Sequence, residues 1–166
     1  LYLYDYDGRQ LAQLTDGNWV VKNVVGLDRD LGRLYFLGTK DGACEQHLYV
    51  CSLRENSKIE RLTNKAGWHA VVFSAKTHFF AAIYSSTEQP PQLILNEIQK
   101  NGETVLVENA MDATHPYKNF WPNHVKPEFS TYQLADGTDL HYKFLRPKKV
   151  EKAPLIVIVY GGPHAQ

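Results

Sequence analysis

The sequence is poor in sulfur, and this shortage excludes one class of protein. Its 166 residues include two cysteines and one methionine. Two cysteines are too few for the disulfide framework that holds many small secreted domains together, and Cys44 and Cys51 match no zinc spacing. They could form a local disulfide, but we expect both to be free thiols that are moderately buried.

Excess charge and long apolar runs are also absent. Eighteen basic residues balance eighteen acidic ones, and the formal net charge is zero. A neutral chain gives no reason to expect nucleic acid or an anionic membrane as a partner. The best apolar run, residues 155–160, is six residues long, whereas a membrane-spanning helix needs about 20. We therefore predict no membrane segment. No secretory signal is visible.

The residues that are abundant favour β-structure. The chain carries ten tyrosines, seven phenylalanines and three tryptophans, and helical periodicity is nearly absent. Short strand-like runs alternate with turn signals such as Asp7-Gly8 and Asn101-Gly102. Ten strands are expected in the first two thirds of the chain: 1–6, 10–14, 20–27, 33–38, 47–53, 58–62, 69–74, 78–85, 92–98 and 104–108.

Two of these sets of strands repeat each other. A Leu-Thr pair at 14–15 precedes Trp19, and the same pair at 62–63 precedes Trp68, at a period of 48 to 49 residues. Four strands in a unit of this length are typical of a β-propeller blade. We predict about two and a half blades over residues 1–109, with the repeated tryptophan wedged between blades. Because so few blades cannot close a ring, we expect further blades upstream.

The pattern changes after residue 109. Residues 110–127 contain three prolines and read as a linker without helix. Strands are expected at 129–134 and 140–145, joined by a turn at 135–138, in a half-buried hairpin. The apolar run at 155–160 is β-branched on both faces, which is typical of a buried parallel strand. Such a strand needs neighbours, so we expect residues 128–166 to be the opening strands of a truncated α/β-hydrolase domain.

These features together resemble one known family. The 48-residue repeat, the proline-rich linker, the segment FSTYQLADGTDLHYKFLRP and the closing PLIVIVYGGPHAQ look like the prolyl oligopeptidase clan, and within it most like dipeptidyl peptidase IV. The resemblance implies a propeller that gates and positions peptide substrates above a serine peptidase domain. That domain would release N-terminal Xaa-Pro or Xaa-Ala dipeptides by acyl-enzyme hydrolysis.

A serine hydrolase needs a nucleophile, a base, an orienting carboxylate and donors to the oxyanion. On the α/β-hydrolase fold the nucleophile lies in a G-x-S-x-G elbow. None of the six serines has these flanking glycines: Ser52, Ser57, Ser74, Ser85, Ser86 and Ser130. We expect the elbow well downstream of Gly162, and we predict that this fragment is inactive alone.

One catalytic group is predicted inside the chain. The resemblance implies that the tyrosine before Gly-Gly-Pro, Tyr160, donates a hydrogen bond to the oxyanion in the parent enzyme. The alternative is that Tyr160 is an ordinary tyrosine at the end of a strand, with no catalytic role. Tyrosine here also favours dipeptidyl peptidase IV over acylaminoacyl peptidases, which commonly carry histidine. Four glutamates lack the pairing that the family uses to hold a substrate amino terminus: Glu55, Glu60, Glu88 and Glu97.

The histidines show no ligand spacing and receive no catalytic role, and we predict no metal or cofactor. A propeller-type interaction module without catalysis, or another branch of the same family, stays the alternative function. Exposed strand edges at an open propeller favour a homo-oligomer. The resemblance leaves the compartment open, with the periplasm or secretion favoured.

Overall fold

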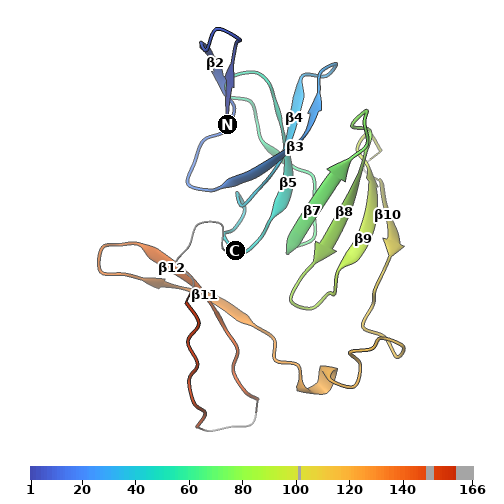
Figure 1. The fold of residues 1–166 in the computed structure, drawn as a ribbon, viewed down its shortest axis with the longest axis vertical. Coiled ribbons are helices and arrows are strands. Elements are labelled where there is room, and N and C mark those ends of the chain that lie inside the picture. The colour runs from blue at the N-terminus through green and yellow to red at the C-terminus, as the bar shows by residue number, and fades with distance from the viewer. Residues whose placement is uncertain (101, 149–151, 160–166) are drawn as a thin grey trace. The chain divides into compact units, whose positions relative to one another are not determined.

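The computed structural model describes residues 1–100, 102–148 and 152–159. The chain divides into two compact units, Leu1–His115 and Pro116–Gln166, and each is described by itself. Nearly every regular element is a strand, as Figure 1 shows. The all-β prediction is therefore confirmed for the described residues. Among these residues, no helix has the length and apolar character that a bilayer crossing requires.

The first unit opens with a two-stranded hairpin. Strands β1 (Tyr2–Tyr4) and β2 (Gln10–Gln13) pair antiparallel. The carboxylate of Asp5 organises the turn between them, because it accepts the backbone N–H groups of Asp7 at 3.1 Å and Arg9 at 2.8 Å. This use of an aspartate side chain in place of a backbone acceptor is the usual reason why such residues favour turns.

Two four-stranded antiparallel meanders follow the hairpin, and we call them the first and second blade. Their strands are adjacent in the order of the chain, so each blade is built from consecutive hairpins. The first blade contains β3 (Val21–Asp28), β4 (Arg33–Gly38), β5 (His47–Ser52) and β6 (Glu60–Arg61). The second contains β7 (Trp68–Phe73), β8 (Phe79–Ser85), β9 (Gln92–Glu97) and β10 (Gly102–Val107). The prediction of two and a half blades is thus confirmed.

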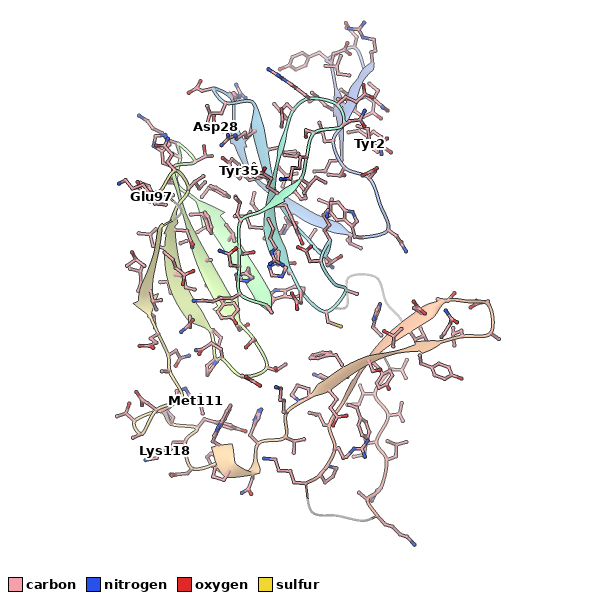
Figure 2. All side chains as sticks on the ribbon, turned by 180° about the vertical axis from the view of Figure 1, so that it is seen from behind. Tyr2, Asp28, Tyr35, Glu97, Met111 and Lys118 are labelled. Carbon is pink, nitrogen blue, oxygen red and sulfur yellow. The ribbon has the colours of Figure 1, made fainter. Side chains whose placement is uncertain are left out.

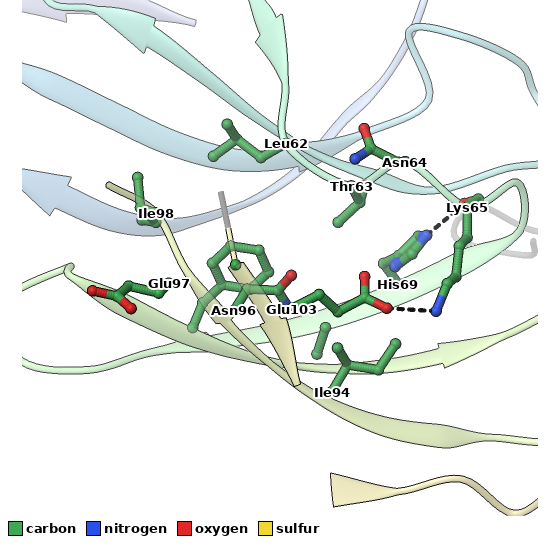
Figure 3. A pocket seen from close by; sticks show the side chains of 13 residues that line it. Leu62, Thr63, Asn64, Lys65, His69, Ile94, Asn96, Glu97, Ile98 and Glu103 are labelled. Atoms are coloured by element: carbon green, nitrogen blue, oxygen red, sulfur yellow. Dashed lines mark hydrogen bonds and ion pairs between the residues drawn. The ribbon is translucent and has the colours of Figure 1, made fainter. Parts of the chain in front are cut away.

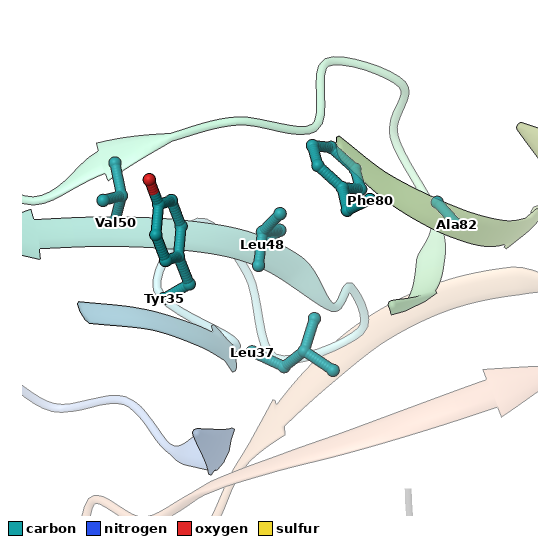
Figure 4. Close-up of a cluster of buried hydrophobic side chains, with 6 residues drawn as sticks. All are labelled: Tyr35, Leu37, Leu48, Val50, Phe80 and Ala82. Atoms are coloured by element: carbon teal, nitrogen blue, oxygen red, sulfur yellow. The ribbon is translucent and has the colours of Figure 1, made fainter. Parts of the chain in front are cut away.

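Alternation along the strands sends their side chains into two apolar clusters. One lies between the blades, where Tyr35, Leu37, Leu48 and Val50 of the first blade meet Phe80 and Ala82 of the second (Figure 4). The other joins the opposite face of the first blade to β2, with Phe36, Tyr49 and Cys51 at its centre. Both faces of the first blade are therefore buried, which is the arrangement that stacked repeats require.

The threonine of the repeated Leu-Thr pair is buried in both copies, whereas the leucine is buried at Leu14 and partly exposed at Leu62. Thr15 and Thr63 are both buried. The indole of Trp19 stacks on Phe36, with ring centroids 6.0 Å apart. Trp19 packs against the cluster that joins β2 to the first blade. Trp68 begins β7 and forms a parallel bridge with Gln46 of the first blade. Figure 2 shows the side chains on the ribbon, with Tyr35 of the first blade and Glu97 of the second labelled.

The second unit differs from the sequence prediction in two ways. A single-turn 3-10 helix, Trp121–Asn123, lies where no helix was expected. Proline fits within it because the first turn of a helix needs no N–H from that residue. The hairpin of β11 (Glu128–Gln133) and β12 (Asp139–Phe144) is present, but eleven of its twelve residues are exposed. The half-buried prediction is wrong there, because the described part of this unit supplies no layer to cover either face.

The predicted buried strand at 155–160 is also corrected over its described part. Residues 155–159 form no strand, and their side chains are between 70% and 90% exposed. A central strand exists only through hydrogen bonds to neighbours on each side, and no described segment pairs with this one.

The thiols of Cys44 and Cys51 are both free. Cys51 is buried as expected, whereas Cys44 is exposed, so the expectation of burial is wrong for Cys44.

Candidate functional site at the blade junction

The predicted oxyanion donor, Tyr160, lies outside the described residues. The glycines that follow it also lie outside them, so no geometry is described for the Tyr160 hydroxyl.

Three serines of the first unit are engaged in turns. Ser57 Oγ donates to the carbonyl of Ser52 at 3.0 Å, Ser74 Oγ accepts the N–H of Phe79, and Ser86 Oγ accepts those of Glu88 and Gln89.

The strongest concentration of polar groups lies where the two blades meet. A small hollow of about 50 Å³ opens between the β6–β7 connection and strands β9 and β10 (Figure 3). Its floor is apolar and includes Phe80, Ala82 and Ile94. At its mouth the Lys65 ammonium lies 2.6 Å from a carboxylate oxygen of Glu103. Since a water molecule occupies about 30 Å³, the hollow has room for water but not for a peptide.

The Lys65–Glu103 pair connects two elements of different blades. Lys65 belongs to the connection that leaves the first blade, and Glu103 belongs to β10, the outermost strand of the second. The side chains of both residues are about two-fifths exposed. Exposed pairs of this kind contribute roughly 0.2 to 1 kcal/mol. The pair therefore aligns the connection with β10 more than it stabilises the fold.

Buried hydrogen bonds hold the inner wall of the hollow. The Tyr84 hydroxyl donates to the carbonyl of Ala66 at 3.1 Å. The Thr63 hydroxyl accepts the N–H of Leu48 at 3.1 Å and lies 2.9 Å from Nδ1 of His47. Thr63 is thus the member of the repeated Leu-Thr pair that ties the outgoing connection to β5.

His69 lines the hollow, and His47 contacts the His69 ring. His47 Nε2 lies 2.7 Å from the Glu45 carboxylate, and His69 Nε2 lies 2.8 Å from the Lys65 carbonyl. Desolvation by burial is the main cause that lowers the pKa of His69 below the ordinary value for a histidine. The sequence prediction treated both as structural strand positions and missed that they meet. Their separation by 22 residues gave no ligand motif. His47 begins the third strand of the first blade and His69 lies in the first strand of the second, so the repeat gave no signal for their contact either.

A wider groove lies farther along the same junction. It measures about 750 Å³, and its lining includes Tyr35, Val50 and Ile98. Two of the cations on its rim are already paired: Arg61 lies 3.3 Å from the Asp41 carboxylate, and Lys58 lies 3.5 Å from that of Glu60. Arg33 is a third cation in the lining, so the charged side chains of the groove are mostly basic.

Comparison with known proteins supplies the family context. The family model described as the dipeptidyl peptidase IV N-terminal region matches residues 1–91. Dipeptidyl peptidase 8 of Mus musculus is 28% identical over 170 residues, which cover 92% of this chain and 18% of that protein. A probable dipeptidyl-aminopeptidase B of Aspergillus fumigatus is 30% identical over 179 residues, covering 99% of this chain and 18% of the relative.

A solved structure shares the fold. The crystal structure of Porphyromonas gingivalis dipeptidyl peptidase 4 superposes with a TM-score of 0.74 at 19% sequence identity, over 88% of this chain and 20% of that one. The chain thus spans about a fifth of the length of each of these relatives.

Proposed function

Because this chain belongs to the dipeptidyl peptidase IV family, we propose that it is a section of a serine exopeptidase that releases dipeptides from the amino termini of peptides. The observation that carries the proposal is the family match over residues 1–91, which covers the hairpin, the first blade and the first two strands of the second. In the whole enzyme the blades gate and position peptide substrates, with Xaa-Pro and Xaa-Ala as the preferred amino-terminal pairs.

The proposal includes a division of the chain. Residues 1–109 are propeller blades, 110–127 are the linker, and 128–166 are the first strands of the peptidase domain. The boundary between the compact units, after His115, falls inside the proposed linker and supports this division. The exposed hairpin of β11 and β12 supports it too, since eleven of its twelve residues offer surface that the rest of a domain would cover.

Tyr160 is the catalytic group that we propose for this section. Its hydroxyl would donate a hydrogen bond to the oxyanion of the tetrahedral intermediate, while the nucleophile comes from sequence beyond this chain. Removal of one such donor typically lowers the rate by a factor of about 10² to 10³. In the full-length enzyme, Tyr160→Phe should therefore reduce kcat to that extent with little change in KM.

Turnover of a Gly-Pro chromogenic substrate measures this effect. Tyr6→Phe is the matched control, because Tyr6 is fully exposed on the β1–β2 turn. The 166-residue chain alone should give no turnover. A full-length enzyme without a G-x-S-x-G elbow, or without inhibitor-sensitive activity, would contradict the peptidase proposal and favour a propeller-type interaction module. Unchanged kcat in Tyr160→Phe would remove only the role of this residue.

We further propose that the isolated chain self-associates through an open strand edge. Strand β10 is outermost in the second blade, and all six of its residues are exposed. Its outer edge pairs with no described strand. Unpaired edges of this kind recruit other strands.

A further inference from the structure

Three aromatic rings stack across the junction between the blades. His47 of β5 and His69 of β7 lie with ring centroids 5.3 Å apart, and Tyr84 of β8 covers the other side of His69 at 4.9 Å. His47 is 0% exposed and His69 is 3% exposed. Two imidazoles from different blades are therefore in contact in a site shielded from solvent, where adding a charge is costly.

The hydrogen bonds of the two rings fix where their protons lie. A carbonyl oxygen only accepts, so His69 Nε2 must carry the hydrogen that points at Lys65. The neutral ring then keeps its lone pair on Nδ1. His47 Nε2 faces the Glu45 carboxylate and also carries a hydrogen. A second proton on His47 would keep that carboxylate as its partner. A second proton on His69 would place a positive charge in this buried contact between the blades.

Charged groups reach His69 from every element that packs around it. Lys65 on the β6–β7 connection and a protonated His47 on β5 disfavour a positive charge there, whereas Glu103 on β10 favours it. Glu45, on the β4–β5 connection, faces His47, and the ring of Tyr84 packs against His69 from β8. Burial is the largest influence and also opposes the charge. His69 is therefore held neutral near pH 7.

The backbone link between the blades lies directly beside these rings. Gln46 precedes His47 and bonds to the start of β7 three times. Its N–H donates to the carbonyl of Gly67 at 3.1 Å, its carbonyl accepts the N–H of His69 at 3.1 Å, and its side-chain amide donates to the carbonyl of His69 at 2.9 Å. Two of these three bonds involve the backbone N–H and C=O of His69, so a shift of the β7 backbone at this residue breaks the link.

We propose that the His47–His69 pair is a pH-sensitive fastening between the two blades, which releases the Gln46 bridge when His69 Nδ1 takes a proton from solvent. A charge on the buried His69 ring beside His47 is costly, and a shift of β7 at this residue lowers the cost by bringing water to the ring, with Glu103 as the nearby anion that favours the charge. The first blade and the second then separate locally at the Gln46 end, while the apolar cluster between them stays packed.

Amide hydrogen exchange of the 166-residue chain, followed by NMR, tests this proposal at pH 7.5 and pH 5.5. After correction for intrinsic exchange rates, we expect the Gln46 and His69 amides to lose up to about tenfold in protection at pH 5.5, which is the limit for one histidine with an ordinary pKa near 6.5 in the open state. Amides of β4 and β8 should keep theirs. Loss of protection in all strands together would indicate global acid unfolding and would overturn the proposal, as would equal protection of Gln46 at both pH values.

Variants identify the group that titrates. His69→Gln can still donate to the Lys65 carbonyl but cannot titrate, so it should abolish the pH dependence. His141→Gln, on the exposed β12, should leave it intact. If His47→Gln abolished the pH dependence of protection and His69→Gln did not, the assignment of His69 as the titrating group would be contradicted. If His69→Gln does not fold, the chemical shift of the His69 Cε1 proton in the unmodified chain is followed against pH instead. Its midpoint should lie below pH 6.5, and a midpoint at or above that value would refute the fastening.

Discussion

At the scale of single residues, Tyr49 is the buried group with the best-defined partners. Its ring is 1% exposed, its hydroxyl donates to a carboxylate oxygen of Asp41 at 2.9 Å, and it accepts the Asp41 N–H at 3.2 Å. Tyr49→Phe removes both bonds and leaves Asp41 with Arg61 as its remaining partner. We expect a loss of about 1 to 2 kcal/mol in the free energy of unfolding, measured by urea denaturation. Tyr132→Phe, at an exposed position, should cost nothing measurable.

The same hydroxyl gives a prediction for alkaline pH. Burial, together with the Asp41 carboxylate, raises the pKa of Tyr49 above its ordinary value near 10. The folded state therefore holds this proton more tightly than the unfolded chain does. The contribution to stability is complete below pH 10 and is lost as the pH rises past it. Tyr49→Phe should show a shallower alkaline decline in stability, and an unchanged slope would contradict this origin of the decline.

At the scale of elements, Gly67 decides how β7 begins. Its backbone has φ +138°, and a Cβ at this position would lie 2.4 Å from the carbonyl oxygen of Ser85. That oxygen belongs to β8 and cannot move without disturbing the β7–β8 pairing. Gly67→Ala should therefore cost about 2 to 4 kcal/mol in stability.

Thermal unfolding of matched variants measures this cost. Gly42→Ala is the control, because Gly42 has no left-handed φ and a Cβ added there would meet no atom within 4 Å. It should leave the Tm within about a degree or raise it slightly, since alanine restricts the unfolded chain. An equal drop in both variants would mean that loop flexibility matters and that the Ser85 contact does not.

Elements were also the level at which the sequence was most informative. Turn residues placed all twelve strands to within about three residues, because each β-turn needs a residue type that reads directly from the chain. The repeated Leu-Thr pair predicted the two four-stranded blades. The run at 155–159 was misjudged, since strand formation there depends on partners and not on propensity. The His47–His69 contact could not be predicted, because it joins two blades whose stacking only the folded chain defines.

At the scale of the whole molecule, the proposed self-association depends on the open edge of the second blade. Three apolar side chains of β10 are exposed: Val105 at 43%, Leu106 at 54% and Val107 at 52%. A register shift between Val105 and Val107 leaves the edge regular only on its amino-terminal side. Edge pairing between two copies would therefore use the first four residues of β10, and we expect the association to be weak and dependent on concentration.

A lysine on this edge should abolish the association, because a charged side chain on an edge strand opposes the addition of a further strand. We expect Val105→Lys to be monomeric by light scattering at concentrations where the unmodified chain is dimeric. Ile158→Lys is the matched control, since Ile158 is 90% exposed in a different apolar segment. If only Ile158→Lys made the chain monomeric, the contact between copies would be assigned to residues 155–159. An unmodified chain that is monomeric at every concentration would refute self-association through β10.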